Sequence, residues 1–170
     1  MASLAYAEAL RAAVRVEENG ALFYRKAAAG SSDPDAARTF ATLAKFEEEH
    51  RGYFYQLSLE LEQRESLFIN DPKGEFAASI TRLADSGVYG FTKDPSSFFD
   101  GNKSTYEAVE FAVGMEKDSI VFYLGLQEAM ADSEEAAKVG GIMKEEMRHL
   151  AILSDLLGKL QGQRKHQEEK

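Results

Sequence analysis

The sequence contains no cysteine among its 170 residues. This absence excludes disulfides, thiolate zinc sites, iron–sulfur clusters, c-type haem attachment and cysteine nucleophiles. Any bound metal ion must therefore be held by Glu, Asp and His. Long apolar runs are also missing, since none approaches the roughly 18 residues needed to cross a bilayer. Glu8 and Arg11 interrupt the N-terminal segment where a secretion signal would need apolar residues, so we expect a cytoplasmic protein.

Positive charge is scarce relative to negative charge. The chain has 20 Lys and Arg residues against 29 Asp and Glu residues, which gives a net charge of −9. Nucleic-acid binding and adhesion to anionic membranes both depend on clusters of Lys and Arg. The charge balance therefore argues against nucleic acid and membranes as partners. The length suits a single domain with one sizeable core.

The first part of the chain has the periodicity of a helical hairpin. Apolar residues such as Leu10 and Val14 follow one another at steps of three, four and seven, which mark one face of a helix. Gly30 supplies a stop signal, and Pro34 suits the first position of a second helix. We expect this second helix to continue into the sixties, so that the first hairpin spans about residues 4–65.

A second hairpin is predicted for about residues 104–160. Ser104 with Glu107 three residues later is the sequence of a capping box at its start. A polar tail, residues 161–170, follows and is expected to fray. Two hairpins joined by a long crossover are a known topology of the four-helix bundle. We therefore predict an all-α four-helix bundle over residues 1–160.

The crossover, about residues 66–103, differs from a solvated linker because it carries many aromatic residues between its Gly and Pro residues. A short helix is predicted near residues 76–83. We expect Phe91, Phe98 and Phe99 to cover either their own bundle or a partner subunit. The size of this apolar set favours a homodimer.

The two hairpins form an internal repeat. Adding 99 to a residue number in the first half gives its counterpart in the second half. The matched pairs that carry chemistry are Glu17 with Glu116, Tyr24 with Tyr123, Glu47 with Glu146, and His50 with His149. The repeat therefore predicts a bundle with approximate twofold symmetry.

The spacing within each hairpin places the four glutamates at one height. Glu17 and Glu47 are 30 residues apart with their midpoint in the predicted turn, and Glu116 and Glu146 have the same relation. Each lies about 15 residues from its turn, or roughly 22 Å along the helix axis. The histidines follow Glu47 and Glu146 by three residues, hence on the same helix face. We expect the four glutamates in one layer near the middle of the bundle, with the two histidines one helical turn away from it.

Charge indicates what this layer holds. Four buried carboxylates could not stay ionised without compensation, because burial costs several kcal/mol per ion. Two divalent cations supply the four positive charges required, and two neutral imidazoles complete the ligand set. Iron or manganese suits these ligands, and zinc is an alternative. A Glu from each of two helices and Glu-x-x-His from each of the others is the general pattern of dinuclear carboxylate bundles.

A single Glu-x-x-His sequence is a weak indication, because glutamate is abundant in this chain. For a lone glutamate, a solvated helix face is the favoured interpretation. Two such sequences 99 residues apart, each matched to a partner glutamate across a turn, are a much stronger indication.

At these residues the chain resembles the rubrerythrin branch of the ferritin-like superfamily. The resemblance covers about residues 5–62 and 104–160. The motifs that carry it are Glu17-x5-Phe23-Tyr24, Glu47-x-x-His50, Glu116-x5-Phe122-Tyr123 and Glu146-x-x-His149. The resemblance implies a ferritin-like four-helix bundle with a di-iron site, chemistry with peroxide or dioxygen, and a dimer.

The resemblance also implies roles for the six residues. Glu47 and Glu146 would bridge two iron ions. Terminal ligands would be Glu17 on one ion and Glu116 on the other. His50 and His149 would each bind one ion.

Two departures from the family pattern affect the expected chemistry. Rubrerythrins typically carry a rubredoxin domain with four cysteines, which supplies electrons to the site. This sequence has no cysteines, so we expect an external electron donor such as a rubredoxin. They also carry an additional glutamate where this chain has Ser119. In the family that glutamate exchanges with a histidine during redox cycling, so Ser119 puts peroxidase turnover in question. The six-ligand set is instead similar to bacterioferritin-type ferroxidase centres.

Tyr24 and Tyr123 lie seven residues, or two helical turns, after Glu17 and Glu116. They are either core aromatics or hydroxyl donors that hold a ligand carboxylate in place.

The functional expectation is a non-haem di-iron oxidoreductase that reacts with hydrogen peroxide or dioxygen. An iron-binding protein for sequestration is the first alternative. A zinc-loaded or metal-free structural bundle is the second.

Overall fold

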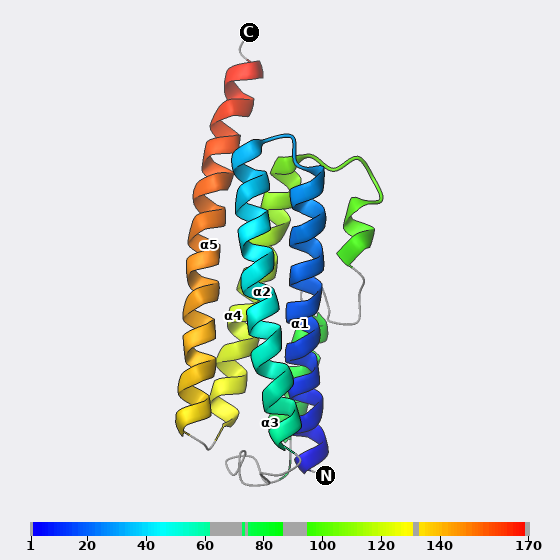
Figure 1. Cartoon of the computed structure of the whole chain (residues 1–170), viewed down its shortest axis with the longest axis vertical. Helices are drawn as coiled ribbons and strands as arrows, with labels where there is room; N and C mark the ends of the chain where they lie inside the picture. The colour runs from blue at the N-terminus through cyan, green and yellow to red at the C-terminus, as the bar shows by residue number, and fades with distance from the viewer. Residues whose placement is uncertain (1, 62–72, 74, 87–94, 131–132, 169–170) are drawn as a thin grey trace.

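The computed structural model describes residues 2–61, 73, 75–86, 95–130 and 133–168. Four long helices lie side by side with their axes nearly parallel and form a bundle (Figure 1). No strand occurs in the described ranges. The predicted all-α bundle is confirmed.

The bundle consists of two hairpins. The first pairs α1 (Ala2–Gly30) with α2 (Pro34–Leu61), and the second pairs α4 (Thr105–Ala129) with α5 (Ser133–Glu168). Between them, the crossover contains α3 (Glu75–Ser86) and the 3-10 helix η2 (Pro95–Phe99). The predicted short helix near residues 76–83 is therefore present as α3, a few residues longer than expected.

Local sequence fixes the helix starts. The Asp33 carboxylate accepts hydrogen bonds from the backbone amides of Asp35 and Ala36, at 2.9 and 2.8 Å. This arrangement satisfies two amides that the first turn of α2 leaves free. Ser104 and Glu107 form the predicted capping box at the start of α4. The hydrogen bond from the Ser104 backbone and the nearby Lys103 ammonium lower the pKa of Glu107 to about 2.

We predict that Ser104→Ala lowers the free energy of unfolding by about 1 kcal/mol, because it removes the cap of α4. Urea denaturation at pH 7 measures this loss. Ser154→Ala is the matched control, since the Ser154 hydroxyl bonds the Leu150 carbonyl in mid-helix and caps no helix end. Glu107 stabilises the fold above its unfolded pKa, so its contribution disappears as the pH falls toward 2. An equal loss in both variants would contradict the role of the cap.

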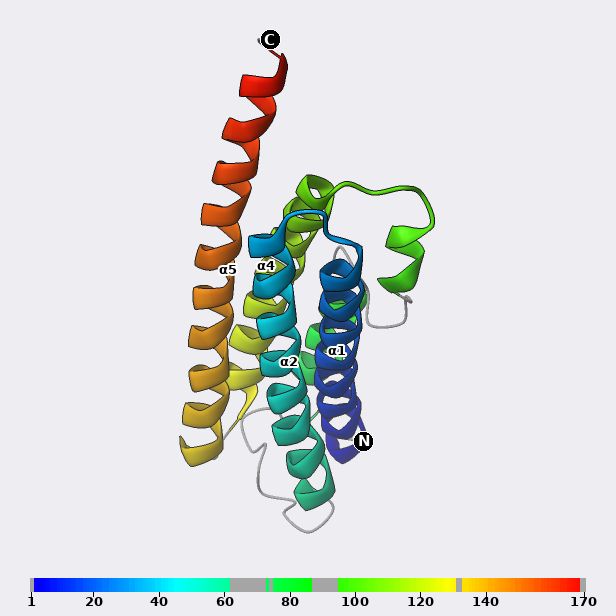
Figure 2. The ribbon, with the colours of Figure 1, turned by 45° about the horizontal axis from the view of Figure 1, so that its top comes forward.

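The C-terminal end of α5 differs from the prediction. The tail was expected to fray after Leu160, but the helix continues to Glu168 and projects beyond the other helices (Figure 2). Leu160 is buried, and the Arg164 guanidinium lies 4.7 Å from the centre of the Tyr106 ring. This cation–π contact and the high helix propensity of Gln, Arg and Lys extend the helix through a polar sequence.

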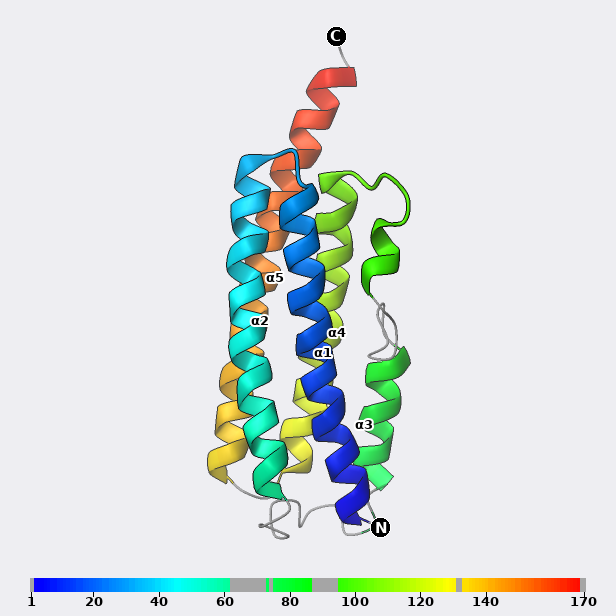
Figure 3. The ribbon, with the colours of Figure 1, turned by 45° about the vertical axis from the view of Figure 1, so that its right-hand side comes forward.

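The crossover packs against its own bundle. The rings of Phe98 and Phe99 lie 5.5 and 5.3 Å from the ring of Phe23, and Phe98 lies 4.6 Å from Phe111. Further along the bundle, α3 contacts both α1 and α4 (Figure 3). Of the two predicted coverings, Phe98 and Phe99 therefore adopt the intramolecular one. Phe91 lies outside the described residues.

The core is divided into two apolar clusters, one toward each end of the bundle. The first includes Leu10, Phe54, Ile80, Tyr123 and Leu126. The second includes Phe23, Tyr24, Phe40, Val109 and Leu153. Both clusters contain residues of all four long helices. Between them the bundle buries a layer of acidic and histidine side chains.

Candidate metal centre

The structure brings all six predicted ligand residues into this layer. Each is at most 5% exposed to solvent, and they are Glu17, Glu47, His50, Glu116, Glu146 and His149. Their nitrogen and oxygen atoms form two groups of four residues, and the ligand atoms of each group lie within 4.8 Å of one another. The register deduced from the two turns therefore agrees with the packing of the helices.

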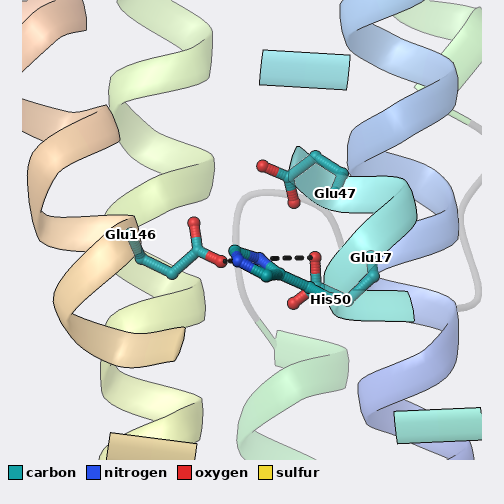
Figure 4. Close-up of side chains that lie close together, drawn as sticks. All are labelled: Glu17, Glu47, His50 and Glu146. Atoms are coloured by element: carbon teal, nitrogen blue, oxygen red, sulfur yellow. Dashed lines mark ion pairs between the residues drawn. The ribbon is translucent and has the colours of Figure 1, made fainter. Parts of the chain in front are cut away.

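The first group contains Glu17, Glu47, His50 and Glu146, which come from α1, α2 and α5 (Figure 4). The Nδ1 atom of His50 lies 2.8 Å from Glu146 Oε1 and 3.7 Å from Glu17 Oε2. Three helices therefore converge on the inner nitrogen of this imidazole.

The second group contains Glu47, Glu116, Glu146 and His149. The Nδ1 atom of His149 lies 3.0 Å from Glu146 Oε2, 3.5 Å from Glu47 Oε1 and 3.8 Å from Glu116 Oε1. The two imidazole rings stack, with their centres 5.9 Å apart. Glu47 and Glu146 belong to both groups, so each has an oxygen near either histidine.

The two tyrosines connect the hairpins through hydrogen bonds. The Tyr24 hydroxyl on α1 donates to Glu116 on α4, and the Tyr123 hydroxyl on α4 donates to Glu17 on α1. Both rings are buried, and burial together with the nearby carboxylates raises the pKa of each tyrosine well above its usual value. Each hydroxyl therefore keeps its proton and orients one carboxylate oxygen.

The pKa values of several side chains in the layer are shifted because the groups are buried close together. Burial and the neighbouring carboxylates raise the pKa of Glu47 and that of Glu116. Burial acts to lower the pKa of His50, but contacts with Glu146 and Glu17 outweigh it and raise the value to about 11. Burial acts to raise the pKa of Glu146, but the two histidines lower it to about 2. Without a cation, protons thus partly neutralise the buried acids.

Several atoms in the layer make no well-directed hydrogen bond within the described part of the chain, although two of them, His50 Nδ1 and Glu146 Oε1, form the 2.8 Å ion pair given above. They are Glu17 Oε2, Glu47 Oε1, His50 Nδ1 and Glu146 Oε1. A buried polar atom without a partner costs about 1–3 kcal/mol. All four belong to the groups described above, and a cation would satisfy them. The residues therefore fit a pair of divalent metal ions, and oxygen with imidazole nitrogen suits iron or manganese.

A small pocket of about 30 Å³ lies beside Glu47 and Glu116, with room for one or two water molecules. Gly20 and Ser119 line it and occupy matching positions of the repeat. A Cβ atom at Gly20 would lie 3.0 Å from Glu47 Oε2, so glycine allows α1 to approach the ligand layer. The pocket exists because α1 and α4 each carry a small residue at this position, Gly20 and Ser119.

Sequence reasoning missed Glu145. Its Oε2 lies 2.9 Å from the outer nitrogen of His50, Nε2, on the side away from the ligand layer. The repeat gives no signal for this residue, because its counterpart 99 positions earlier is Phe46. The buried acid Glu135 is separate from the layer and is paired with Tyr53 and Lys138.

Among the described residues, none of the helices combines the length and apolar character that a membrane span requires.

Comparisons with known proteins agree with this geometry. The model of the family described as Rubrerythrin matches residues 8–157. A solved structure from Thermotoga maritima, titled as a candidate ferritin-like diiron-carboxylate protein, aligns with a TM-score of 0.65 and 25% identity. The alignment covers 89% of this chain and 93% of that chain. A comparison with curated proteins finds no match.

Proposed function

Since the chain belongs to the rubrerythrin family, we propose that it is a non-haem di-iron oxidoreductase that reacts with hydrogen peroxide or dioxygen. The observation that carries this proposal is the pair of overlapping ligand groups that share Glu47 and Glu146. This arrangement fits two neighbouring ions better than one. Family membership favours iron over manganese and zinc.

The proposed ligand roles follow the two groups. Glu17 and His50 would hold one ion, and Glu116 and His149 would hold the other. Glu47 and Glu146 belong to both groups and would serve both ions. The hydroxyls of Tyr24 and Tyr123 fix the two terminal glutamates from the opposite hairpin.

The protein's contribution is geometry and exclusion of water. When bound, two ferrous ions supply two electrons for reduction of a peroxide or dioxygen. The two apolar clusters close the layer along the bundle axis, so bulk water does not enter from the ends. The pocket lined by Gly20 and Ser119 lies beside the layer and has room for one or two water-sized molecules.

The 170-residue sequence has no cysteines, and therefore no thiolate ligands for a rubredoxin-type iron centre. We propose a separate donor protein such as a rubredoxin. We also propose a cytoplasmic homodimer; this proposal rests on family membership, because Phe98 and Phe99 pack on their own bundle.

Iron loading tests the proposal directly. The metal-free chain is incubated with Fe(II) without oxygen, its bound iron is counted, and it is mixed with peroxide or with dioxygen in a stopped-flow instrument. We expect two irons per chain and rapid growth of near-ultraviolet absorption. A chain that takes up zinc but no iron, or no metal at all, would instead support a structural bundle.

An iron-sequestration role is the second candidate. Ser119 favours it, because the glutamate associated with rubrerythrin turnover is missing at this position. Repeated cycles of Fe(II) and dioxygen distinguish the two functions. Uptake well beyond two irons per chain would support sequestration. Saturation at two irons per chain, with repeated reduction of peroxide once an artificial electron donor is added, would support the oxidoreductase.

We predict that Ser119→Glu increases peroxide turnover severalfold. The new carboxylate would reach the pocket beside Glu47 and Glu116 that Ser119 lines, and the resemblance to rubrerythrins implies an additional glutamate at this sequence position. Steady-state reduction of peroxide with an artificial donor measures the change. Ser119→Gln, which has nearly the same size and no charge, is the matched control. Equal rates in both variants would mean that other features limit turnover.

A further inference from the structure

The outer sides of the two histidines have different neighbours. The outer nitrogen of His50, Nε2, lies 2.9 Å from a carboxylate oxygen of Glu145. His149 instead has the Phe46 ring beside it, with ring centres 5.2 Å apart. Positions 46 and 145 are related by the same 99-residue offset as the ligands. The two halves of the repeat thus have the same ligand residues, but they differ in the residue beside each imidazole.

The two ring nitrogens of His50 have different neighbours, and this difference defines the role of Glu145. Nδ1 of His50 faces Glu146 and Glu17 inside the layer, so it is the nitrogen available to a metal ion. Nε2 then carries the proton of the neutral imidazole and donates a hydrogen bond to Glu145. A carboxylate that accepts this hydrogen bond fixes the tautomer and the ring orientation, and it makes the imidazole a stronger ligand.

Position and exposure suit this role. The Glu145 side chain lies at the bundle surface, 42% exposed, while that of His50 is 5% exposed. The carboxylate therefore contacts the imidazole from outside and does not compete for the ion. Phe46 offers His149 an apolar ring and no acceptor, and it also adds no negative charge to that half of the layer.

We propose that Glu145 is a positioning residue that makes the two metal positions unequal, so that the Glu17–His50 position binds its ion more tightly and fills first. This inference rests on the metal centre proposed above, and it adds an order of loading that the ligand set alone does not contain.

Cobalt titration of the full metal-free chain tests it, with calorimetry for affinity and visible absorption for coordination. Wild-type protein should bind two Co²⁺ ions in two distinguishable steps. Glu145→Ala should weaken the tighter step by about 10- to 100-fold, the usual effect of losing such a carboxylate, and leave the weaker step nearly unchanged. Glu49→Ala is the matched control, because Glu49 is an exposed neighbour of His50 on α2. It should leave both steps unchanged.

The reverse variant provides an independent measurement. Phe46→Glu places a carboxylate behind His149 at the matching position of the repeat, and it should tighten the weaker step. Phe46 is 38% exposed, so this substitution does not bury a new charge completely.

The outcomes separate the two proposals. Two ions bound by wild type, with Glu145→Ala affecting both steps equally or neither, would overturn the role of Glu145 and leave the metal centre intact. Failure of wild type to bind two ions would overturn the metal centre, and the inference would fall with it.

Discussion

Glu47→Ala is expected to abolish paired metal binding. Glu47 belongs to both ligand groups, so its loss removes an oxygen from each position at once. We expect the metal content to fall from two ions per chain to one or none, and oxidation of bound iron by peroxide to be lost. Each ion present at 100 times its dissociation constant stabilises the fold by about 2.7 kcal/mol, and the variant should lose most of this stabilisation.

Metal analysis after gel filtration and thermal melts with and without metal measure these effects. The metal-free fold should survive the substitution, because burial and the neighbouring carboxylates already disfavour ionised Glu47. Glu48→Ala is the matched control, since Glu48 is the adjacent residue and pairs with Arg25 and Arg51 at the surface. Two ions per chain in Glu47→Ala would count decisively against the assigned ligands.

Phe54→Ala is expected to cause the largest loss of stability in the metal-free protein. Phe54 is fully buried in the first apolar cluster, where its ring stacks on Tyr123 with centres 5.0 Å apart. Truncation of a buried Phe removes its transfer free energy and leaves a cavity, at a cost of about 3–5 kcal/mol. Tyr123 would also lose the ring that holds it against Glu17, so metal affinity should decrease as well.

Guanidinium denaturation of the metal-free chain measures the loss. The matched control is Tyr55→Ala, because Tyr55 is the next residue on α2 and 49% exposed. Surface substitutions of this kind change the free energy of unfolding by about 0.5 kcal/mol or less. Similar losses in the two variants would show that the first cluster does not carry the stability assigned to it.

Much of the fold could be predicted because its signals are local. The apolar spacing in each long helix, Pro34 at a helix start and the capping box at Ser104 all depend on residues a few positions apart. The layer could be placed because Glu17 and Glu47 lie at equal distances from the turn of an antiparallel hairpin, which fixes their heights. The 99-residue repeat carries that register into the second half.

Other features depend on contacts between distant segments, which periodicity does not encode. The predicted end of α5 near Leu160 is wrong, because the Arg164 side chain contacts Tyr106 on α4 and the helix continues. Glu145 was missed because its role depends on how α5 faces His50 on α2. The packing of Phe98 and Phe99 on Phe23 could likewise not be predicted without knowing the path of the crossover.

The duplicated layout of the chain has a consequence for its ancestry. Each half contains one of the buried glutamates of the layer on its first helix, one Glu-x-x-His on its second, and one tyrosine that reaches across to the other half. Two copies of a single hairpin could therefore assemble the whole cluster, but identical copies would force both positions to be the same. Fusion of the halves into one polypeptide removes that constraint, and the pair Phe46 and Glu145 shows the divergence that fusion permits.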